Sequence, residues 1–253
     1  MSKKMERTEL SEHCKDAVAD LSSLLEHFIQ SGIEKMTKRA MLIAYWLKTY
    51  VKYLRREDDL SSVSVFRLKR GAVICVEFGY RIGRELGGRH YAVVLDTNNS
   101  IHRNTVTVVP LGSEKESSKD AAYNAILEDG IYGTVIHKLY ALIESARKTL
   151  EDAAKMKKEI EGASEEEQTA LEELRQGKIK SAQALIDQAD IWMKEIAHLK
   201  TGSVAKIDQV TTISKMRILQ PLKKDHPLYG VRLSARDLDK IDAKLMALYF
   251  SGK

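Results

Sequence analysis

The residues best suited to acid–base and phosphate chemistry lie together in a glycine-rich segment, residues 83–91. Glu85, Arg89 and His90 occur there among three glycines. The imidazole of His90 can donate or accept a proton near neutral pH, because its unperturbed pKa is ~6.5. An arginine guanidinium can bind two oxygens of a phosphate at once. Because glycines let the backbone adopt positive φ angles, we expect a flexible loop that presents these side chains together.

The stretches on both sides of this loop are rich in β-branched residues, which favour strands. Turn-forming residues at 96–100 separate two of the predicted strands, and further strand patterns follow much later in the chain. Neither group of strands is large enough for a stable sheet alone, so we expect the two groups to form one sheet. The predicted strands are residues 71–78, 91–95, 106–111, 202–207, 209–213 and 216–219.

Helical periodicity marks both ends of the chain. Apolar residues three and four apart predict two helices between residues 7 and 56, with a break at residues 31–32. The polar residues 55–59 that follow are typical of a linker. Near the other end, Ser234 is expected to cap a last helix that has leucines and isoleucine at helical spacing.

A third helical region interrupts the strand patterns at residues 139–200. Its narrow apolar stripe predicts an antiparallel hairpin with coiled-coil-like packing. We expect the turn at residues 162–163, because Ser164 and Glu167 form a capping-box pattern for the second helix. Gly177 is expected to kink or break that helix. Such a hairpin is better suited to presenting a surface or forming a dimer than to catalysis.

The composition limits the possible classes of protein. No apolar run approaches ~18 residues, so a membrane span is not expected. The N-terminus lacks the apolar stretch of a signal peptide, and the two cysteines lie in dissimilar contexts. We therefore expect a reducing, cytoplasmic setting. The histidines share no metal-ligand spacing, so neither a metal nor another cofactor is expected.

The net charge of +5 is unevenly distributed. Residues 139–200 contain more acidic than basic side chains, so the rest of the chain is more basic than the total indicates. A basic body is compatible with a polyanionic ligand such as nucleic acid. An ordinary basic surface is the other interpretation, and the charge alone favours it.

Four segments resemble the PemK/MazF family of toxin endoribonucleases, in the order in which that family has them. Residues 70–71 match the start of its first strand, and residues 83–91 resemble its loop Gly-Ser-Glu-x-Gly-Gly-x-Arg-Pro. Residues 108–113 resemble its strand that ends in Pro-(Ile/Leu)-(Thr/Ser). Residues 202–217 resemble its second signature, a strand of the form Gln-(Val/Ile)-x-(Thr/Ser)-Ile-x-(Lys/Trp).

The resemblance covers roughly residues 68–125 and 200–250 and implies an α+β fold. Its core would be a small SH3-like β-barrel of the PemK/CcdB type with a C-terminal helix, commonly as a homodimer. Residues 1–60 would then be an N-terminal helical extension, and residues 61–253 a barrel domain interrupted by the hairpin at 139–200. The resemblance also implies nucleic-acid binding (RNA, with DNA also considered), metal-independent cleavage of single-stranded RNA such as mRNA, and a cognate antitoxin protein.

Two catalytic positions of the family are changed in this chain. The family's arginine corresponds to His90, with Arg89 in the adjacent position. Its threonine corresponds to Gly112, with Ser113 in the adjacent position. The acidic residue of the loop, Glu85, is retained. Either the site is rebuilt with the same functional groups one position along, or the activity is altered or lost.

Metal-independent RNA cleavage uses the substrate's own 2′-OH as the nucleophile and leaves a 2′,3′-cyclic phosphate and a 5′-OH. The protein must supply a base, an acid and positive charge for the phosphorane, and each contributes roughly 10²–10⁴-fold in rate. His90 would act as base or acid, with Glu85 as an orienting group. The expected catalytic residues are His90, Arg89, Glu85 and Ser113, and the expected RNA-binding residues are Arg81, Arg84, Gln209, Thr211 and Lys215.

Simpler interpretations and other functions remain open at this point. His90 can be a structural or solvated histidine, Glu85 an ion-pair partner, and Gln209 a residue that ties strands together. The chain could be a toxin without nuclease activity that binds a protein target such as a topoisomerase, as the CcdB-like fold does. It could also be an RNA-binding or scaffolding protein whose hairpin recruits a partner. The N-terminal helices could shield the RNA groove as a built-in inhibitor.

Overall fold

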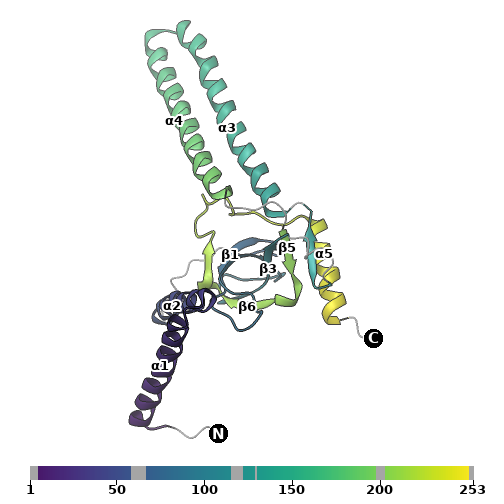
Figure 1. The fold of residues 1–253 in the computed structure, drawn as a ribbon. Coiled ribbons are helices and arrows are strands. Elements are labelled where there is room, and N and C mark those ends of the chain that lie inside the picture. Colours follow the sequence, from purple (N-terminus) through teal and green to yellow (C-terminus); the bar gives the residue numbers. More distant parts are fainter. Residues whose placement is uncertain (1–4, 58–66, 115–121, 129, 198–202, 251–253) are drawn as a thin grey trace. The chain divides into compact units, whose positions relative to one another are not determined.

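The computed structural model describes residues 5–57, 67–114, 122–128, 130–197 and 203–250. The chain forms two compact units (Figure 1). The first consists of Met1–Leu60 together with Gly79–Ile82, and the second of Ser61–Phe78 together with Gly83–Lys253. None of the helices in the described ranges is long and apolar enough to cross a membrane.

The first unit is built on two helices, α1 (Arg7–Gln30) and α2 (Glu34–Arg55). The predicted break between them is confirmed: Gly32 adopts a φ of 67°, a conformation that glycine tolerates without strain. The helices bury few side chains against each other, namely Phe28, Ala40 and Ile43.

Segment 79–82 completes this unit. The hydroxyl of Tyr80 accepts a hydrogen bond of 2.7 Å from Nε of Arg39 on α2. Gly79 lies against the ring of Trp46 so closely that a Cβ there would stand 2.6 Å from the ring. Any side chain at residue 79 would therefore displace either this segment or the indole.

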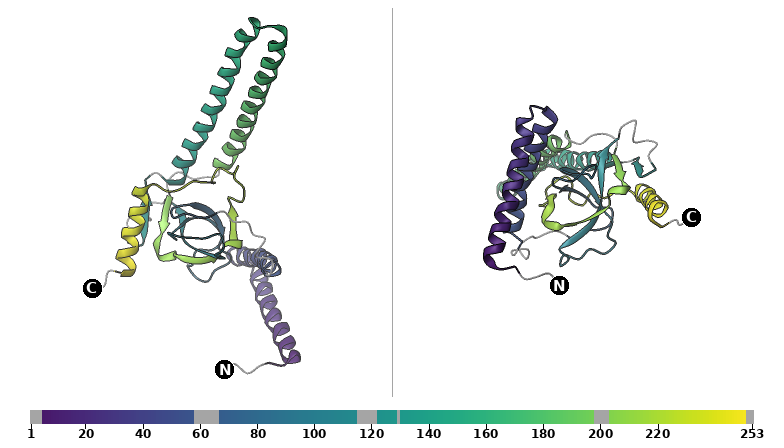
Figure 2. Two further views of the ribbon diagram at one scale, coloured as in Figure 1. Left: turned by 180° about the vertical axis from the view of Figure 1, so that it is seen from behind. Right: turned by 60° about the horizontal axis from the view of Figure 1, so that its bottom comes forward.

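Among its described residues the second unit contains seven antiparallel strands, which Figures 1 and 2 show curving around one another. Their pairing order is β4-β5-β3-β2-β1-β7, with β6 paired to β3 outside this path. The sheet is therefore open, with β4 and β7 at its two ends. The α+β class is confirmed. The strands are β1 (Val73–Glu77), β2 (Arg89–Val94), β3 (Thr105–Ser113), β4 (Asn124–Leu127), β5 (Ser203–Lys206), β6 (Thr211–Ser214) and β7 (Ile218–Gln220).

The prediction that strands before and after the hairpin share one sheet is also confirmed. Strand β3 pairs with β5 and β6, and β1 pairs with β7. The predicted strand at 209–213 is shorter than expected, because residues Ile207–Gln209 form a 3-10 turn (η3) before β6 begins. A second such turn, Lys215–Arg217 (η4), likewise delays β7. Strand β4 was not predicted.

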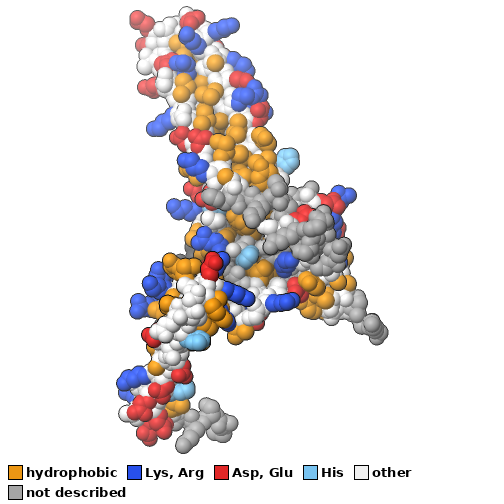
Figure 3. Space-filling view, in the orientation of Figure 1, with side chains coloured by type: hydrophobic (Ala, Val, Ile, Leu, Met, Phe, Trp, Pro, Cys, Tyr) orange, Lys and Arg blue, Asp and Glu red, His pale blue; other side chains and the backbone are white. Residues whose placement is uncertain are grey.

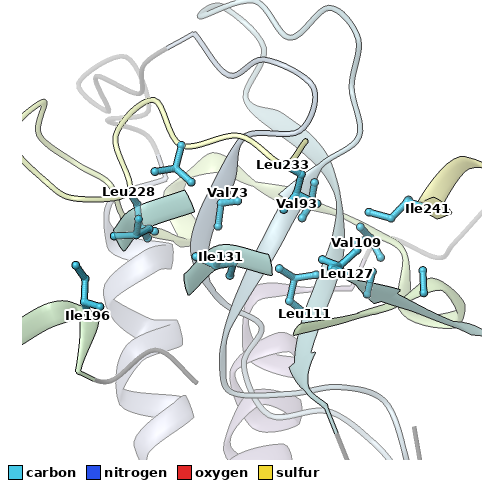
Figure 4. Close-up of a cluster of buried hydrophobic side chains, with 14 of the residues drawn as sticks. Val73, Val93, Val109, Leu111, Leu127, Ile131, Ile196, Leu228, Leu233 and Ile241 are labelled. Atoms are coloured by element: carbon cyan, nitrogen blue, oxygen red, sulfur yellow. The ribbon is translucent and has the colours of Figure 1, made fainter. Parts of the chain in front are cut away.

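Alternate residues of the strands point into two separate cores, because side chains along a strand alternate between its faces. We call the first the helix-side core, because helices cover it; it includes Val73, Val93 and Val109 with Ile131 and Ile241 (Figure 4). The second, the strand core, is built from the strands and their loops. Its buried members include Ile74, Val76, Ala92, Val94, Val106 and Val108.

The hairpin consists of α3 (Gly130–Glu161) and α4 (Glu165–Ile196), joined by a short turn. The predicted capping box of Ser164 and Glu167 is confirmed. The expected start at residue 139 is wrong, because α3 already begins at Gly130. The expected break at Gly177 is wrong as well, since α4 runs through it without interruption. Apolar side chains follow the contact between the two helices, while charged side chains surround it (Figure 3).

The last helix, α5 (Ala235–Leu245), confirms the predicted cap. The hydroxyl of Ser234 accepts a hydrogen bond of 3.2 Å from the backbone N–H of Asp237. Ile241 on this helix is fully buried in the helix-side core. Such burial of an isoleucine stabilises the fold by about 1.5–3 kcal/mol.

Candidate active site

Strand β3 changes its neighbour near its end, and this change creates the candidate site. Its ladder with β2 ends at the pair Ala92–Pro110. Proline has no N–H to donate to a ladder, which favours separation of the strands at this point. From Leu111 onward β3 pairs with β5 instead, beginning with the pair Leu111–Ala205. The start of β2 and the end of β3 therefore diverge from a common point.

His90 and Gly112 occupy corresponding positions on the two diverging strands. Each lies two residues beyond the last pair, Ala92–Pro110, and on the same face of its strand as that pair. Beyond it their partners differ, since His90 pairs with Val76 on β1 and Gly112 with Val204 on β5. His90 shares its face of β2 with Ala92 and Val94, which belong to the strand core. It is half-buried. The positions that the family resemblance makes catalytic thus lie on one face of the sheet.

Arg89 and Ser113 lie on the other face. Arg89 alternates with His90 and shares the side of Tyr91 and Val93, which contact the helix-side core. Ser113 shares the side of Leu111, a member of the same core. The expected flexible loop with imidazole and guanidinium side by side is therefore wrong: both residues belong to strand β2, and a shift of one position turns a side chain to the opposite face.

The surroundings of Arg89 confirm that it faces a different environment. It pairs across the sheet with Glu77, and the next pair on the same face is Cys75–Tyr91. Burial raises the pKa of the Cys75 thiol to about 11, although the positive charge of Arg89 counteracts part of this effect. Burial likewise raises the pKa of Tyr91. Arg89 therefore adjoins a neutral thiol and phenol at neutral pH.

The loop before β2 is tied to the segment that follows β5. The backbone N–H of Leu86 donates a hydrogen bond of 3.0 Å to Oε1 of Gln209. Gly83 and Gly88 adopt φ angles of 65° and 79°, so glycine is needed at both turns of the loop. The side-chain oxygen of Gln209 therefore positions the loop, in agreement with its simpler structural interpretation.

The other expected site residues are dispersed. Glu85 and Arg84 are exposed on the loop, whereas Arg81 belongs to segment 79–82 of the first unit. Thr211 begins β6 opposite Val108 and is half-buried.

Lys215 does not fit an RNA contact. It is only 4% exposed, and its ammonium donates a hydrogen bond of 2.7 Å to the backbone oxygen of Ser100. Burial lowers the pKa of Lys215, and the nearby charge of Arg103 lowers it further. The side chain therefore supports the turn between β2 and β3, and we do not retain it in the proposed interface.

Lys206 is a basic residue of the site that the sequence analysis missed. It lies at the end of β5, half-buried, and its ammonium donates a hydrogen bond of 3.0 Å to Oδ1 of Asn124 on β4. A Cβ at Gly112 would stand 3.2 Å from Cε of Lys206, so the lysine side chain passes directly over the glycine. Two features of the sequence could have indicated this residue. One is a lysine at the end of a short strand, and the other is a glycine at the family's threonine position.

No metal site is visible around these residues. Within the described ranges no group of three His, Cys, Asp or Glu side chains is placed to hold a metal ion. The polar side chains on the face of His90 include its own imidazole, the ammonium of Lys206, the amide of Asn124 and the hydroxyl of Thr211. Such groups can move protons and stabilise negative charge.

Part of this region matches a known family. Residues 69–176 match the family model described as PemK-like, MazF-like toxin of type II toxin-antitoxin system. No curated protein matches the chain. Residues 69–176 are therefore similar to the PemK/MazF toxin family, and the α+β fold is consistent with that family's fold carrying helical additions. The match spans β1 to β4, α3 and the start of α4.

Proposed function

We propose that this protein is the toxin of a toxin–antitoxin or phage-defence module and that it cleaves single-stranded RNA without a metal. The observation that supports the proposal is that His90 and Gly112 lie on the same face of β2 and β3, each two residues beyond the point where these strands separate. These two residues correspond to the catalytic arginine and threonine of the PemK/MazF family. The family match at residues 69–176 supports toxin activity.

In the proposed reaction the 2′-oxygen of the substrate attacks the adjacent phosphorus and the bond from phosphorus to the 5′-oxygen breaks. His90 takes the proton from the 2′-OH or gives one to the departing 5′-oxygen. The product ends are a 2′,3′-cyclic phosphate and a 5′-OH. Arg84 and Glu85, exposed on the loop before β2, contact the RNA strand or orient the groups that do.

Arg89 and Ser113 take supporting roles in this proposal, because they lie on the opposite face from His90. The partners are single-stranded RNA such as mRNA and a cognate antitoxin protein that blocks access to the site. A homodimer and a coiled-coil role for the α3–α4 hairpin stay predictions.

The test is cleavage of a defined single-stranded RNA by the purified protein in the presence of EDTA. We expect wild-type protein to cleave at short sequences and His90→Ala to lose roughly 10²–10⁴-fold in rate, the usual contribution of an acid–base group. His102→Ala is the matched control, because His102 is exposed in the turn between β2 and β3. Full cleavage by His90→Ala would remove His90 from the mechanism.

A toxin without nuclease activity is the second candidate. The separation of Arg89 and Ser113 from His90 favours it, because the family's catalytic side chains are not reassembled on one face by a simple shift. Expression that arrests growth while cellular RNA stays intact would support this candidate. Growth arrest that is abolished by His90→Ala, with RNA fragments in the wild type, would exclude it.

A further inference from the structure

We propose that Lys206 supplies the positive charge that binds the scissile phosphate, in place of the arginine that this chain lacks at residue 90. The inference rests on the proposed function and adds a residue to its site. In the family the cation comes from the strand that here carries His90. In this chain it comes from β5, which follows the helical hairpin in the sequence.

The strand registers place Lys206 on the same face as Gly112, and by alternation on the face of His90. Gly112 pairs with Val204 on β5, and residues two apart on a strand share a face. Lys206 therefore shares the face of Gly112, and with it the face of His90. The side chain extends toward Gly112, since its Cε lies 3.2 Å from where a Cβ of residue 112 would be.

The glycine at residue 112 explains how the lysine reaches this place. A threonine there would put its Cβ at that tight distance from the lysine chain, with the γ atoms still to be accommodated. Either the lysine or the strand would have to move. The two residues are therefore coupled: the loss of the threonine side chain opens the path that the Lys206 side chain occupies.

Asn124 holds the ammonium in position without neutralising it. It pairs with Lys206 across the β4–β5 ladder, and its Oδ1 accepts the hydrogen bond of 3.0 Å. Asn124 is 5% exposed, so this acceptor is fixed by its surroundings. An ammonium has three N–H donors, and among the described residues one of them is used, by Asn124. The other two remain for non-bridging oxygens of a phosphate, whose negative charge increases as the phosphorane forms.

The test combines cleavage with binding of an RNA that cannot be cleaved, in which every 2′-OH is methylated. Lys206→Met keeps the length of the side chain and removes its charge. We expect its cleavage rate to fall on the order of 10²-fold, as for the loss of one donor to a developing oxyanion. We expect the slope of log affinity against log salt to fall by about 0.7, the contribution of one phosphate contact on a single strand.

Lys223→Met is the matched control, because Lys223 is exposed on the segment after β7, and it should leave both quantities unchanged. Gly112→Ala provides a second variant that keeps every charge. It should reduce cleavage in the wild-type background and have no further effect in Lys206→Ala, because the side chain that it displaces is then absent.

The outcomes separate this inference from the proposed function. Wild-type cleavage that is retained in Lys206→Met, with an unchanged salt slope, overturns the role of Lys206 and leaves the nuclease proposal standing. Equal effects of Gly112→Ala in both backgrounds also overturn the coupling. A wild-type protein that neither cleaves RNA nor binds the methylated RNA overturns both. The inference is supported if Lys206→Met lowers both the cleavage rate and the salt slope of binding while Lys223→Met changes neither.

Discussion

The side-chain oxygen of Gln209 accepts a hydrogen bond of 3.0 Å from the backbone N–H of Leu86, across 123 residues of sequence. This bond connects the glycine-rich loop before β2 with the turn after β5. The two segments lie on either side of the helical hairpin in the sequence. The Gln209 side chain thus links parts of the candidate site that the helical hairpin separates in the sequence.

Replacement of Gln209 by leucine should loosen the loop. We expect a loss of about 0.5–1.5 kcal/mol in the free energy of unfolding, the usual net value of one hydrogen bond. The amide of Leu86 should exchange with solvent faster, which hydrogen-exchange measurements can detect. Gln209→Glu keeps an acceptor oxygen and should retain the protection of Leu86. Equal protection in Gln209→Leu would contradict the role given to this bond.

Lys215→Met should destabilise the fold without weakening RNA binding. The variant leaves the backbone oxygen of Ser100 without its present donor, at a cost of about 1–3 kcal/mol. An RNA contact would instead change the salt dependence of binding, so titrations at two salt concentrations distinguish the roles. A reduced salt slope in Lys215→Met would restore this residue to the RNA interface.

The pH dependence of stability provides a second test of buried Lys215. Burial lowers its pKa in the folded state, so the unfolded chain binds the proton more tightly. Stability contributed by this group should therefore rise with pH between the lowered folded-state pKa and the ordinary pKa of lysine. Lys215→Met should flatten this rise in urea denaturation across the alkaline range. An unchanged profile would show that the lysine is not buried as described.

The two cysteines should differ strongly in reactivity. Burial raises the pKa of Cys75 to about 11, so its thiol is neutral at pH 8. Alkylating reagents attack the thiolate. We expect iodoacetamide to label exposed Cys14 in the native protein and to label Cys75 only after unfolding. Mass spectrometry of the labelled peptides checks this, and rapid labelling of native Cys75 would contradict it.

Trp192 should anchor the hairpin to the segment that follows β7. Its ring is 5% exposed, its Nε1 donates a hydrogen bond of 2.7 Å to the backbone oxygen of Asp225, and the ammonium of Lys138 lies 4.9 Å from the ring centroid. Trp192→Ala should cost about 3–5 kcal/mol in urea denaturation. Ile191→Ala, on the exposed side of the same turn, should stay within about 0.5 kcal/mol. Equal effects would contradict this anchoring.

Much of the fold could be predicted because its local signals agree with one another. The capping box at Ser164 and the cap at Ser234 mark helix starts directly. The start of α3 could not be predicted, because glycines and β-branched residues are poor helix formers. Burial of Ile131 and Val135 in the fold compensates for this weak propensity. Periodicity alone does not reveal such burial.

The candidate site was predictable as a region but not as an arrangement. From the sequence we predicted Arg89 and His90 in a loop. In the structure β2 begins at Arg89, so the two side chains lie on opposite faces. Only the strand register reveals this. Lys206 was missed because its neighbour Gly112 is far away in sequence, and a lone lysine at the end of a strand usually faces solvent.

The chemical nature of the RNA ends tests the central claim most directly. Wild-type protein is incubated with a defined single-stranded RNA in EDTA, and the fragments are analysed by mass spectrometry and by phosphorylation with a kinase. The account predicts 2′,3′-cyclic phosphate ends and 5′-OH ends, with none formed by His90→Ala. Fragments with 5′-phosphate and 3′-OH ends, or RNA that stays intact while the protein arrests growth, would contradict it.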